Sequence, residues 1–192
     1  MDVAGPGLIV IGGFPGAGKS TVAELLAKEL QGTRLCSDVL GGSIRDTLRG
    51  VVPSSEAFRA GHDLMFRLCD DFLDDGCTVV VDCNMGWQFQ WRALDLLRAN
   101  HPDVPWCPLI IRCPMNICRE RLRTRHVEDP GAHPPVDEFF DRNPQLGGLW
   151  SYLEALDRPD VAYVDGSSSP SAVYADALRQ IRVRFAREAA GP

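Results

Sequence analysis

Lysine is nearly absent from this 192-residue chain: only Lys19 and Lys28 occur. With so few lysines, the Asn-Lys-x-Asp guanine-reading motif of regulatory GTPases is excluded. A basic surplus is also missing, because the formal net charge is −6, whereas binding to a nucleic-acid backbone favours a positive surface. No apolar run is long enough to span a bilayer, and the N-terminus lacks the basic segment and apolar core of a signal peptide. We therefore expect a soluble, cytoplasmic protein with no membrane partner and no nucleic-acid partner.

Cysteine pairs at metal-binding spacing are missing as well. The seven cysteines show neither Cys-x-x-Cys pairs nor a Cys/His zinc pattern. Several lie in apolar runs and are typical of small buried side chains in a reducing compartment. With 45% hydrophobic residues, the chain is long enough for a core without disulfides or a metal. We predict a single domain over residues 1–192.

Short apolar runs alternate with amphipathic segments along the whole chain. This alternation predicts an α/β protein with a five-stranded parallel sheet covered by helices on both faces. The expected strands are 8–11, 34–36, 78–81, 108–111 and 161–164, and the expected helices are 19–30, 39–48, 54–74, 88–99, 115–125, 136–156 and 171–189.

The segment GGFPGAGKST, residues 12–21, matches the phosphate-binding pattern G-x-x-x-x-G-K-[ST] at every fixed position. It stands between an apolar run and a helical segment, which is the context that the motif requires. Glycines let successive backbone N–H groups turn inward, and the helix N-terminus adds partial positive charge. Lys19 then reaches the β and γ phosphates, and Ser20 can ligate Mg²⁺. The alternative is a glycine-rich turn with a chance lysine. The predicted ATP-binding residues are Gly13, Phe14, Pro15, Gly16, Ala17, Gly18, Lys19, Ser20 and Thr21.

Candidate acceptor residues follow the second expected strand. Ser37 and Asp38 lie at its carboxyl end, the edge where open α/β sheets bind ligands. A carboxylate there can accept a proton from an attacking hydroxyl, so Asp38 is the candidate catalytic base. The alternative is that Asp38 only caps the following helix. Arg45, about two turns further, is a candidate for binding an anionic or polar acceptor, or a plain surface residue.

The segment TVVVDCN, residues 78–84, has the form of a Walker B strand that ends in Asp82. A carboxylate at this position can hold Mg²⁺ through water or position the acceptor, and the sequence leaves both roles open. Trp87, Phe89 and Trp91 follow. Trp87 is a candidate for stacking on a substrate ring, while ordinary packing is the alternative for all three.

The expected helix 54–74 is amphipathic and contributes a buried stripe. Its members are Phe58, Leu64, Met65, Leu68 and Phe72. Arg59 and His62 of the same helix could line the acceptor pocket, or lie on a solvated face.

A run of arginines precedes a loop rich in Pro, Gly and acids. Arg121 and Arg125 share one helical face, and Arg119 and Arg123 an adjoining one. The loop cannot continue the helix, so we expect a mobile lid over about residues 126–136. Arg121 and Arg125 are the predicted catalytic cations that close over the transferring phosphoryl group. Arg142, beyond the loop, is a weaker candidate. A second polar turn, DGSSSP at 165–170, is also expected to be functional.

In the order of these segments the chain resembles the small P-loop kinases of the zeta-toxin, polynucleotide-kinase and chloramphenicol-phosphotransferase type, which are often grouped as AAA-like domain proteins. The similarity rests on GFPGAGKST, CSD after the second strand, VVVDCN, IIRCPMNICRERLRTR, PPVDEFFDR and VDGSSSP. It implies a P-loop kinase fold, an acceptor base at Asp38 and lid arginines at Arg121 or Arg125. The lid has more prolines and acids than that of a polynucleotide kinase, which argues against a nucleic-acid acceptor.

These observations lead to one main hypothesis and two alternatives. The main one is an ATP- and Mg²⁺-dependent kinase that phosphorylates a hydroxyl of a small molecule, such as a nucleoside-like or antibiotic compound. The first alternative is a polynucleotide 5′-hydroxyl kinase. The second is a module that senses ATP without transferring phosphate.

Overall fold

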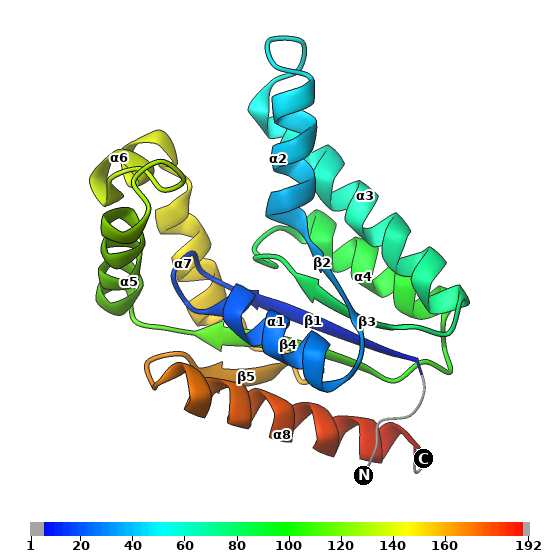
Figure 1. Cartoon of the computed structure of the whole chain (residues 1–192). Coiled ribbons are helices and arrows are strands. Elements are labelled where there is room, and N and C mark those ends of the chain that lie inside the picture. Colours follow the sequence, from blue (N-terminus) through cyan, green and yellow to red (C-terminus); the bar gives the residue numbers. More distant parts are fainter. Residues whose placement is uncertain (1–5, 190–192) are drawn as a thin grey trace.

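A five-stranded parallel sheet forms the centre of the molecule (Figure 1). The computed structural model describes residues 6–189; the remaining ends of the expected domain lie outside the described residues. The strand order is β2-β3-β1-β4-β5, and all four pairings are parallel. The predicted fold class is therefore confirmed. The strands are β1 (Gly7–Gly13), β2 (Thr33–Cys36), β3 (Thr78–Asp82), β4 (Trp106–Arg112) and β5 (Ala162–Asp165).

Eight helices are found in the described part of the chain, and they cover both faces of the sheet. The first group packs on one face and consists of α1 (Lys19–Glu29) and α8 (Pro170–Ala189). The second group packs on the other face and consists of α3 (Ser54–Asp74), α4 (Gln88–Asn100) and α7 (Leu146–Ala155). The others are α2 (Ser37–Thr47), α5 (Met115–Glu128) and α6 (Val136–Arg142). Across residues 6–189, none of these helices combines the length and apolarity needed to cross a membrane.

The central strand β1 and its neighbour β3 are the most deeply buried strands. Every residue of β1 and β3 is buried, because helices cover both faces of these strands. Register pairs Ile11 with Asp82 and Cys36 with Asp82, so the carboxyl ends of β1, β2 and β3 meet at one edge. Helix α2 rises from this edge on one side of the P-loop, and α5 and α6 lie on the other side (Figure 1).

The helix expected over 136–156 is wrong in extent, because the structure divides it into α6 and α7. Asn143 leaves helical geometry with φ −130° and ψ 64°. Pro144 follows, which lacks a backbone N–H and disfavours helical angles at the residue before it. The loop boundary is also shifted: α5 continues to Glu128, so residues 126–128 are helical and the irregular segment covers 129–135.

The buried stripe expected on α3 is only partly correct. Met65 is fully buried, but Leu64 is 39% exposed. Gly61 lets α3 approach α2 so closely that a Cβ there would lie 2.5 Å from the Gly41 Cα. This contact fixes the helix rotation, and the buried side of α3 consists of Ala57, Gly61, His62, Met65, Phe66, Cys69 and Leu73.

Candidate active site

The segment 12–21 forms the predicted turn between β1 and α1. Gly16 has a φ of 85°, which L-residues rarely adopt, and a Cβ at this position would lie 2.5 Å from the carbonyl oxygen of Cys118. Gly18 caps α1 with a φ of 103°. The first turn of α1 contains no acidic residue, so its partial positive charge is not neutralised locally and favours an anion.

Lys19 lies at the first position of α1 and points back across the turn. Its Nζ donates a hydrogen bond to the Phe14 carbonyl, at 3.1 Å. Ser20 and Thr21 are exposed beside it. A backbone carbonyl thus holds the ammonium next to the inward-turned amides, where phosphate oxygens would bind.

A cavity of about 270 Å³ opens beside this turn. Its walls come from three separate elements: the start of α1, the second half of α5 and the start of α8. Its lining residues are Ala17, Gly18, Thr21, Val22, Arg121, Thr124, Arg125, Glu128, Pro170 and Val173. The predicted pair Arg121 and Arg125 therefore lies in one cavity with the P-loop.

Arg121 is held in place, whereas Arg125 is not. The Arg121 guanidinium donates to the carbonyl oxygens of Ala17, at 3.3 Å, and Ser168, at 3.1 Å, and contacts the Cys113 Sγ at 3.7 Å. Within the described residues, no hydrogen bond or ion pair holds the Arg125 guanidinium. Arg121 thus forms a fixed wall of the cavity, while Arg125 is available to a ligand.

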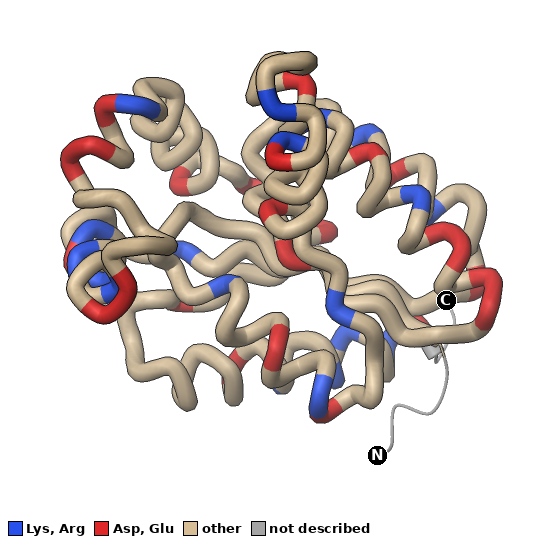
Figure 2. The backbone as a smooth tube through the Cα atoms, turned by 45° about the horizontal axis from the view of Figure 1, so that its top comes forward, with Lys and Arg blue, Asp and Glu red and all other residues tan. Residues whose placement is uncertain are grey.

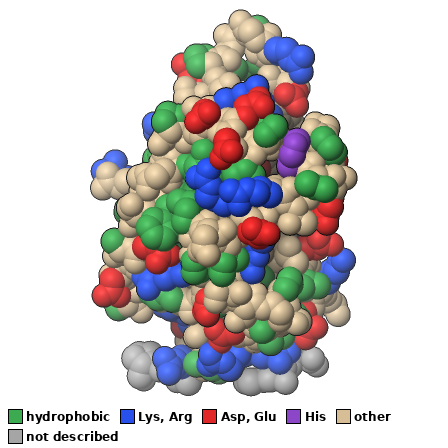
Figure 3. All heavy atoms as spheres, turned by 90° about the vertical axis from the view of Figure 1, so that its left-hand side faces the viewer, with side chains coloured by type: hydrophobic (Ala, Val, Ile, Leu, Met, Phe, Trp, Pro, Cys, Tyr) green, Lys and Arg blue, Asp and Glu red, His purple; other side chains and the backbone are tan. Residues whose placement is uncertain are grey.

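Two further arginines of α5 lie outside this cavity, as expected for a solvated face. Arg119 pairs with Asp137 at 2.8 Å and covers the ring of Phe140, and Arg123 lies 3.9 Å from Glu120. Basic positions gather along α5 (Figure 2), and basic side chains also gather in the middle of the face that α5 and α6 form (Figure 3). Arg142 pairs with Glu138 within α6.

Helix α6, which follows the 129–135 loop, is in contact with the P-loop. The Phe140 ring of α6 lies 6.1 Å from the ring of Phe14, between centroids. Phe14 is only 2% exposed, so the second residue of the P-loop motif is a packing contact for α6.

The acceptor-side residues occupy the start of α2. Asp38 is exposed, and among residues 6–189 no hydrogen bond or ion pair engages its carboxylate. Ser37, in contrast, is 3% exposed and its hydroxyl lies 3.5 Å from the Asp82 carbonyl, so it faces β3 instead of solvent. Arg45 is exposed and pairs with Asp46 at 3.5 Å.

Asp82 ends β3 as expected, but a neighbouring strand supplies its partner. The Arg34 guanidinium donates to its Oδ2 at 2.5 Å, and the carboxyl group is 3% exposed. Burial, the largest single influence, lowers the pKa of Arg34, but the hydrogen bond to Asp82 and the nearby negative charges, chiefly that of Asp82, together outweigh burial and raise the arginine pKa. Ser20 is exposed, so its hydroxyl could ligate a metal ion directly, whereas Asp82 would act on one only from beyond its ion pair with Arg34. No cluster of three His, Cys, Asp or Glu side chains that could hold a metal is present in the described part.

Aromatic side chains of α3 and of the start of α4 pack together, with Trp87 just before α4. The Phe58 ring lies 5.2 Å from Trp87 and 6.3 Å from Phe89, both edge-on. Trp91 is 4% exposed and its indole N–H donates to the Met85 carbonyl, so packing explains it. Trp87 is half-buried and keeps one part of its ring accessible.

His62 lies within this aromatic group and is fully buried, so the alternative of a solvated face is wrong for it. Its Nδ1 lies 2.9 Å from the Phe58 carbonyl; because a carbonyl only accepts, Nδ1 carries the proton. Its Nε2 is buried with no partner. Burial lowers the pKa of His62 below its usual value of 6.5, although the Phe58 carbonyl and the nearby Asp38 and Asp63 oppose this shift. Arg59 is exposed and lies over the Phe89 ring.

Two thiols support the site without being reactive. Burial raises the pKa of Cys118 to about 12 and also raises that of Cys113. All seven cysteines are free; five are buried, as predicted for several of them, whereas Cys36 and Cys77 are half-buried.

Five cavity residues were missing from the predicted set: Thr124, Glu128, Pro170, Val173 and Val22. The first two follow the arginine pair by helical spacing, which is a signal that the sequence contains. The polar turn at 165–170 indicated the third. Val173 becomes a neighbour of α1 only through the packing of α8 on α1.

The strand order and the P-loop together define the class: this is a P-loop fold of the kinase type. A protein-family model described as an AAA domain matches residues 8–139. The chain therefore belongs to this AAA domain family.

Solved structures share the architecture over nearly the whole chain. A gluconokinase from Sinorhizobium meliloti is 21% identical, with a TM-score of 0.65, over 97% of this chain and 98% of its own. A sugar kinase from Janibacter is 21% identical, with a TM-score of 0.63, over 94% and 97%. The tunicamycin resistance protein of Deinococcus radiodurans is 19% identical, with a TM-score of 0.60, over 93% and 94%. No curated protein sequence matches the chain.

Proposed function

We propose that this protein is an ATP- and Mg²⁺-dependent kinase that transfers a phosphoryl group to a hydroxyl of a small molecule. The observation that carries the proposal is the free, exposed carboxylate of Asp38 at the sheet edge where the P-loop lies. A catalytic base at this place would face the γ-phosphate of a bound triphosphate. The gluconokinase and sugar kinase among the similar structures act, by their names, on small molecules.

The proposed reaction uses the P-loop to position the nucleotide. The amides of the P-loop and Lys19 bind the β and γ phosphates, and Ser20 ligates Mg²⁺. When bound, Mg²⁺ supplies charge neutralisation for the phosphates. Asp38 accepts the proton of the acceptor hydroxyl, whose oxygen bonds to the γ-phosphorus as the bond to ADP breaks.

The cavity beside the P-loop is the proposed place of the nucleobase. Its position next to Ala17 and Gly18 puts it within reach of a nucleotide whose phosphates occupy the turn. Arg121 forms a fixed wall, and Arg125 supplies a cation to the developing charge on the phosphoryl group. Segment 126–136 is the proposed lid, and helix α6, which begins at its end, contacts the P-loop through Phe140 and Phe14.

For the acceptor, we infer a nucleoside-like or antibiotic compound. Trp87 offers the accessible part of a ring for stacking, and Arg45 offers a cation two turns along α2 from Asp38. The negative net charge disfavours a polynucleotide, so the acceptor is a small molecule. As an ATP-dependent enzyme it would act in the cytoplasm.

The test is mass-spectrometric detection of phosphoryl transfer from ATP to a pooled library of nucleosides, sugars, sugar acids and antibiotics. Asp38→Asn should lower the rate of product formation by roughly 10²- to 10⁴-fold, because the general base is lost. Asp46→Asn is the matched control, because Asp46 is an exposed carboxylate of the same helix. It should keep the rate.

Each other outcome points to a different function. Transfer to a 5′-hydroxyl of an oligonucleotide, weakened by added salt, would favour a polynucleotide kinase. ATP binding without transfer to any acceptor would favour the sensing module. Transfer that survives Asp38→Asn would overturn the role of Asp38.

A further inference from the structure

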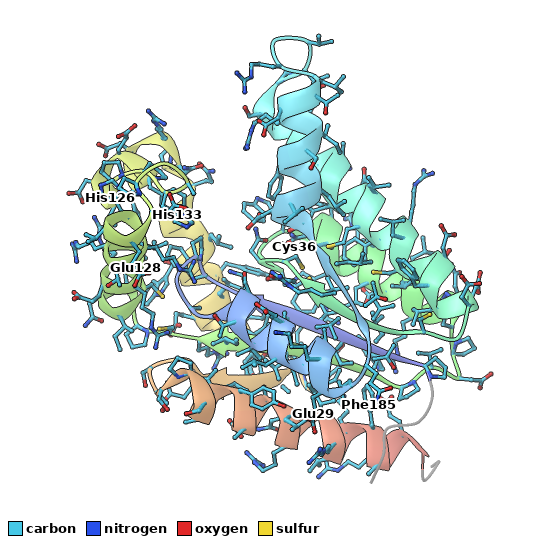
Figure 4. The ribbon with its side chains drawn as sticks, in the orientation of Figure 1. Glu29, Cys36, His126, Glu128, His133 and Phe185 are labelled. Carbon is cyan, nitrogen blue, oxygen red and sulfur yellow. The ribbon has the colours of Figure 1, made fainter. Side chains whose placement is uncertain are left out.

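The outer end of the cavity carries one carboxylate that nothing in the fold uses. Glu128 is the only acidic side chain among the lining residues, and it is exposed. Within residues 6–189, no hydrogen bond or ion pair engages it. Figure 4 labels Glu128 on the last turn of α5, and the cavity places it opposite α1.

Besides Glu128 and Arg121, the polar side chains of the lining are Arg125, Thr21 and Thr124. Val22, Pro170 and Val173 give apolar walls suited to the faces of a flat ring. The Thr124 hydroxyl already donates to the Glu120 carbonyl, at 3.3 Å. An arginine side chain only donates hydrogen bonds, so Glu128 is the charged acceptor of this lining for N–H donors at the edge of a ring bound between these walls.

The spacing along α5 agrees with the length of a nucleoside. Arg121 contacts Ala17 at the P-loop end of the cavity, and Glu128 follows seven residues later. At a rise of about 1.5 Å per residue, the two positions are about 10 Å apart along the helix axis. A base bound beyond Arg121 would turn its outer edge toward Glu128.

We propose that Glu128 reads the nucleobase through N–H donors and makes the site accept GTP as well as ATP. This inference rests on the proposed use of a nucleotide. An ionised carboxylate only accepts hydrogen bonds. Guanine presents two adjacent donors, N1–H and the N2 amino group, which match the two oxygens. Adenine presents one donor, the N6 amino group, beside the N1 lone pair, which repels the second oxygen.

The experiment measures equilibrium binding of ATP, GTP and ITP by calorimetry, without an acceptor, to the full chain and to Glu128→Gln. ITP keeps N1–H but lacks the N2 amino group, so it isolates one of the two donors. The control variant is Glu120→Gln, since Glu120 is an exposed carboxylate of the same helix outside the cavity lining.

We expect the parent protein to bind GTP within about threefold of ATP. Glu128→Gln should weaken GTP binding about tenfold or more, because a charge-assisted bidentate contact is lost. In the same variant, ITP binding should weaken less than GTP binding, and ATP binding should weaken by less than about twofold. Glu120→Gln should leave all three unchanged.

Two results would overturn the inference. If Glu128→Gln changed ATP and GTP equally, or if the parent protein bound GTP more than about a hundredfold weaker than ATP, Glu128 would not read the base. If the parent protein bound no nucleotide at all, the proposed function would fail with it, so the two failures are distinguishable.

Discussion

Arg121 joins the P-loop to the turn before α8: its Nη1 lies 3.3 Å from the Ala17 carbonyl oxygen, and its Nη2 lies 3.1 Å from that of Ser168. A planar guanidinium can serve two acceptors at once, whereas a lysine ammonium at this position is a single point donor. The contact therefore holds α5 and the 165–170 turn at fixed places around the cavity.

Arg121→Lys should weaken ATP binding about tenfold, because a lysine cannot hold both the Ala17 and the Ser168 carbonyl, and the cavity loses one of these two anchors. Calorimetric titration with ATP measures this. Arg123→Lys is the control, because Arg123 is exposed and its one ion pair among residues 6–189 is with Glu120, at 3.9 Å. The ATP affinity of this variant should match that of the parent protein. Equal affinities for all three proteins would mean that the guanidinium does not shape the cavity.

Lys19→Ala should lower turnover by about 10²- to 10³-fold, the cost of removing one donor to the transition state. The chain provides an ideal comparison, since its only other lysine, Lys28, is exposed and pairs with Glu24 at 2.9 Å. Lys28→Ala should retain full turnover. The measurement is the steady-state rate with whichever acceptor the library identifies, and an active Lys19→Ala enzyme would remove the P-loop from the mechanism.

The parts of this structure that follow local rules were predictable from sequence. Three features are each encoded within a short stretch of sequence: the P-loop pattern, every one of the five apolar strands, and the spacing of Arg121 and Arg125. The sheet order then brings Asp82 and Cys36 to one edge without further information.

The parts that depend on contacts between distant segments were not predictable. The close approach of Gly61 to Gly41 sets the rotation of α3, so Leu64 turns outward and His62 inward. Likewise, the pairing of Asp82 with Arg34 depends on strand adjacency. The break before α7 did have a local signal, Asn143-Pro144, which the apolar periodicity on either side obscured.

His62 should make folding stability depend on pH. Burial lowers its pKa in the folded protein, whereas the unfolded chain titrates near 6.5. Below pH 6.5 the unfolded state therefore binds more protons than the folded state. As the pH is lowered, the free energy of unfolding falls by up to about 1.4 kcal/mol per pH unit. Above this pH the histidine contributes no dependence.

Urea unfolding at several pH values between about 5 and 8 measures this slope. His62→Gln should reduce the slope below pH 6.5, and His133→Gln, which removes an exposed histidine, should leave it unchanged. The same slope in all three proteins would show that His62 is not the group that loses its proton on folding.

Gly61→Ala should destabilise the contact between α2 and α3. The added Cβ would lie 2.5 Å from the Gly41 Cα and N, and backbone atoms cannot yield as a side chain can. The helices must separate, at a cost of about 1–3 kcal/mol in the free energy of unfolding. Gly147→Ala in α7 is the opposite case, because nothing lies within 4 Å of its added Cβ. It should stabilise by up to about 1 kcal/mol, since alanine is the better helix former.

Because α2 begins with Ser37 and Asp38, Gly61→Ala should also slow phosphoryl transfer. The ATP affinity should stay the same, because it is set at the far side of the P-loop. A parallel loss of ATP affinity would mean that the α2–α3 contact supports the P-loop as well as the acceptor side.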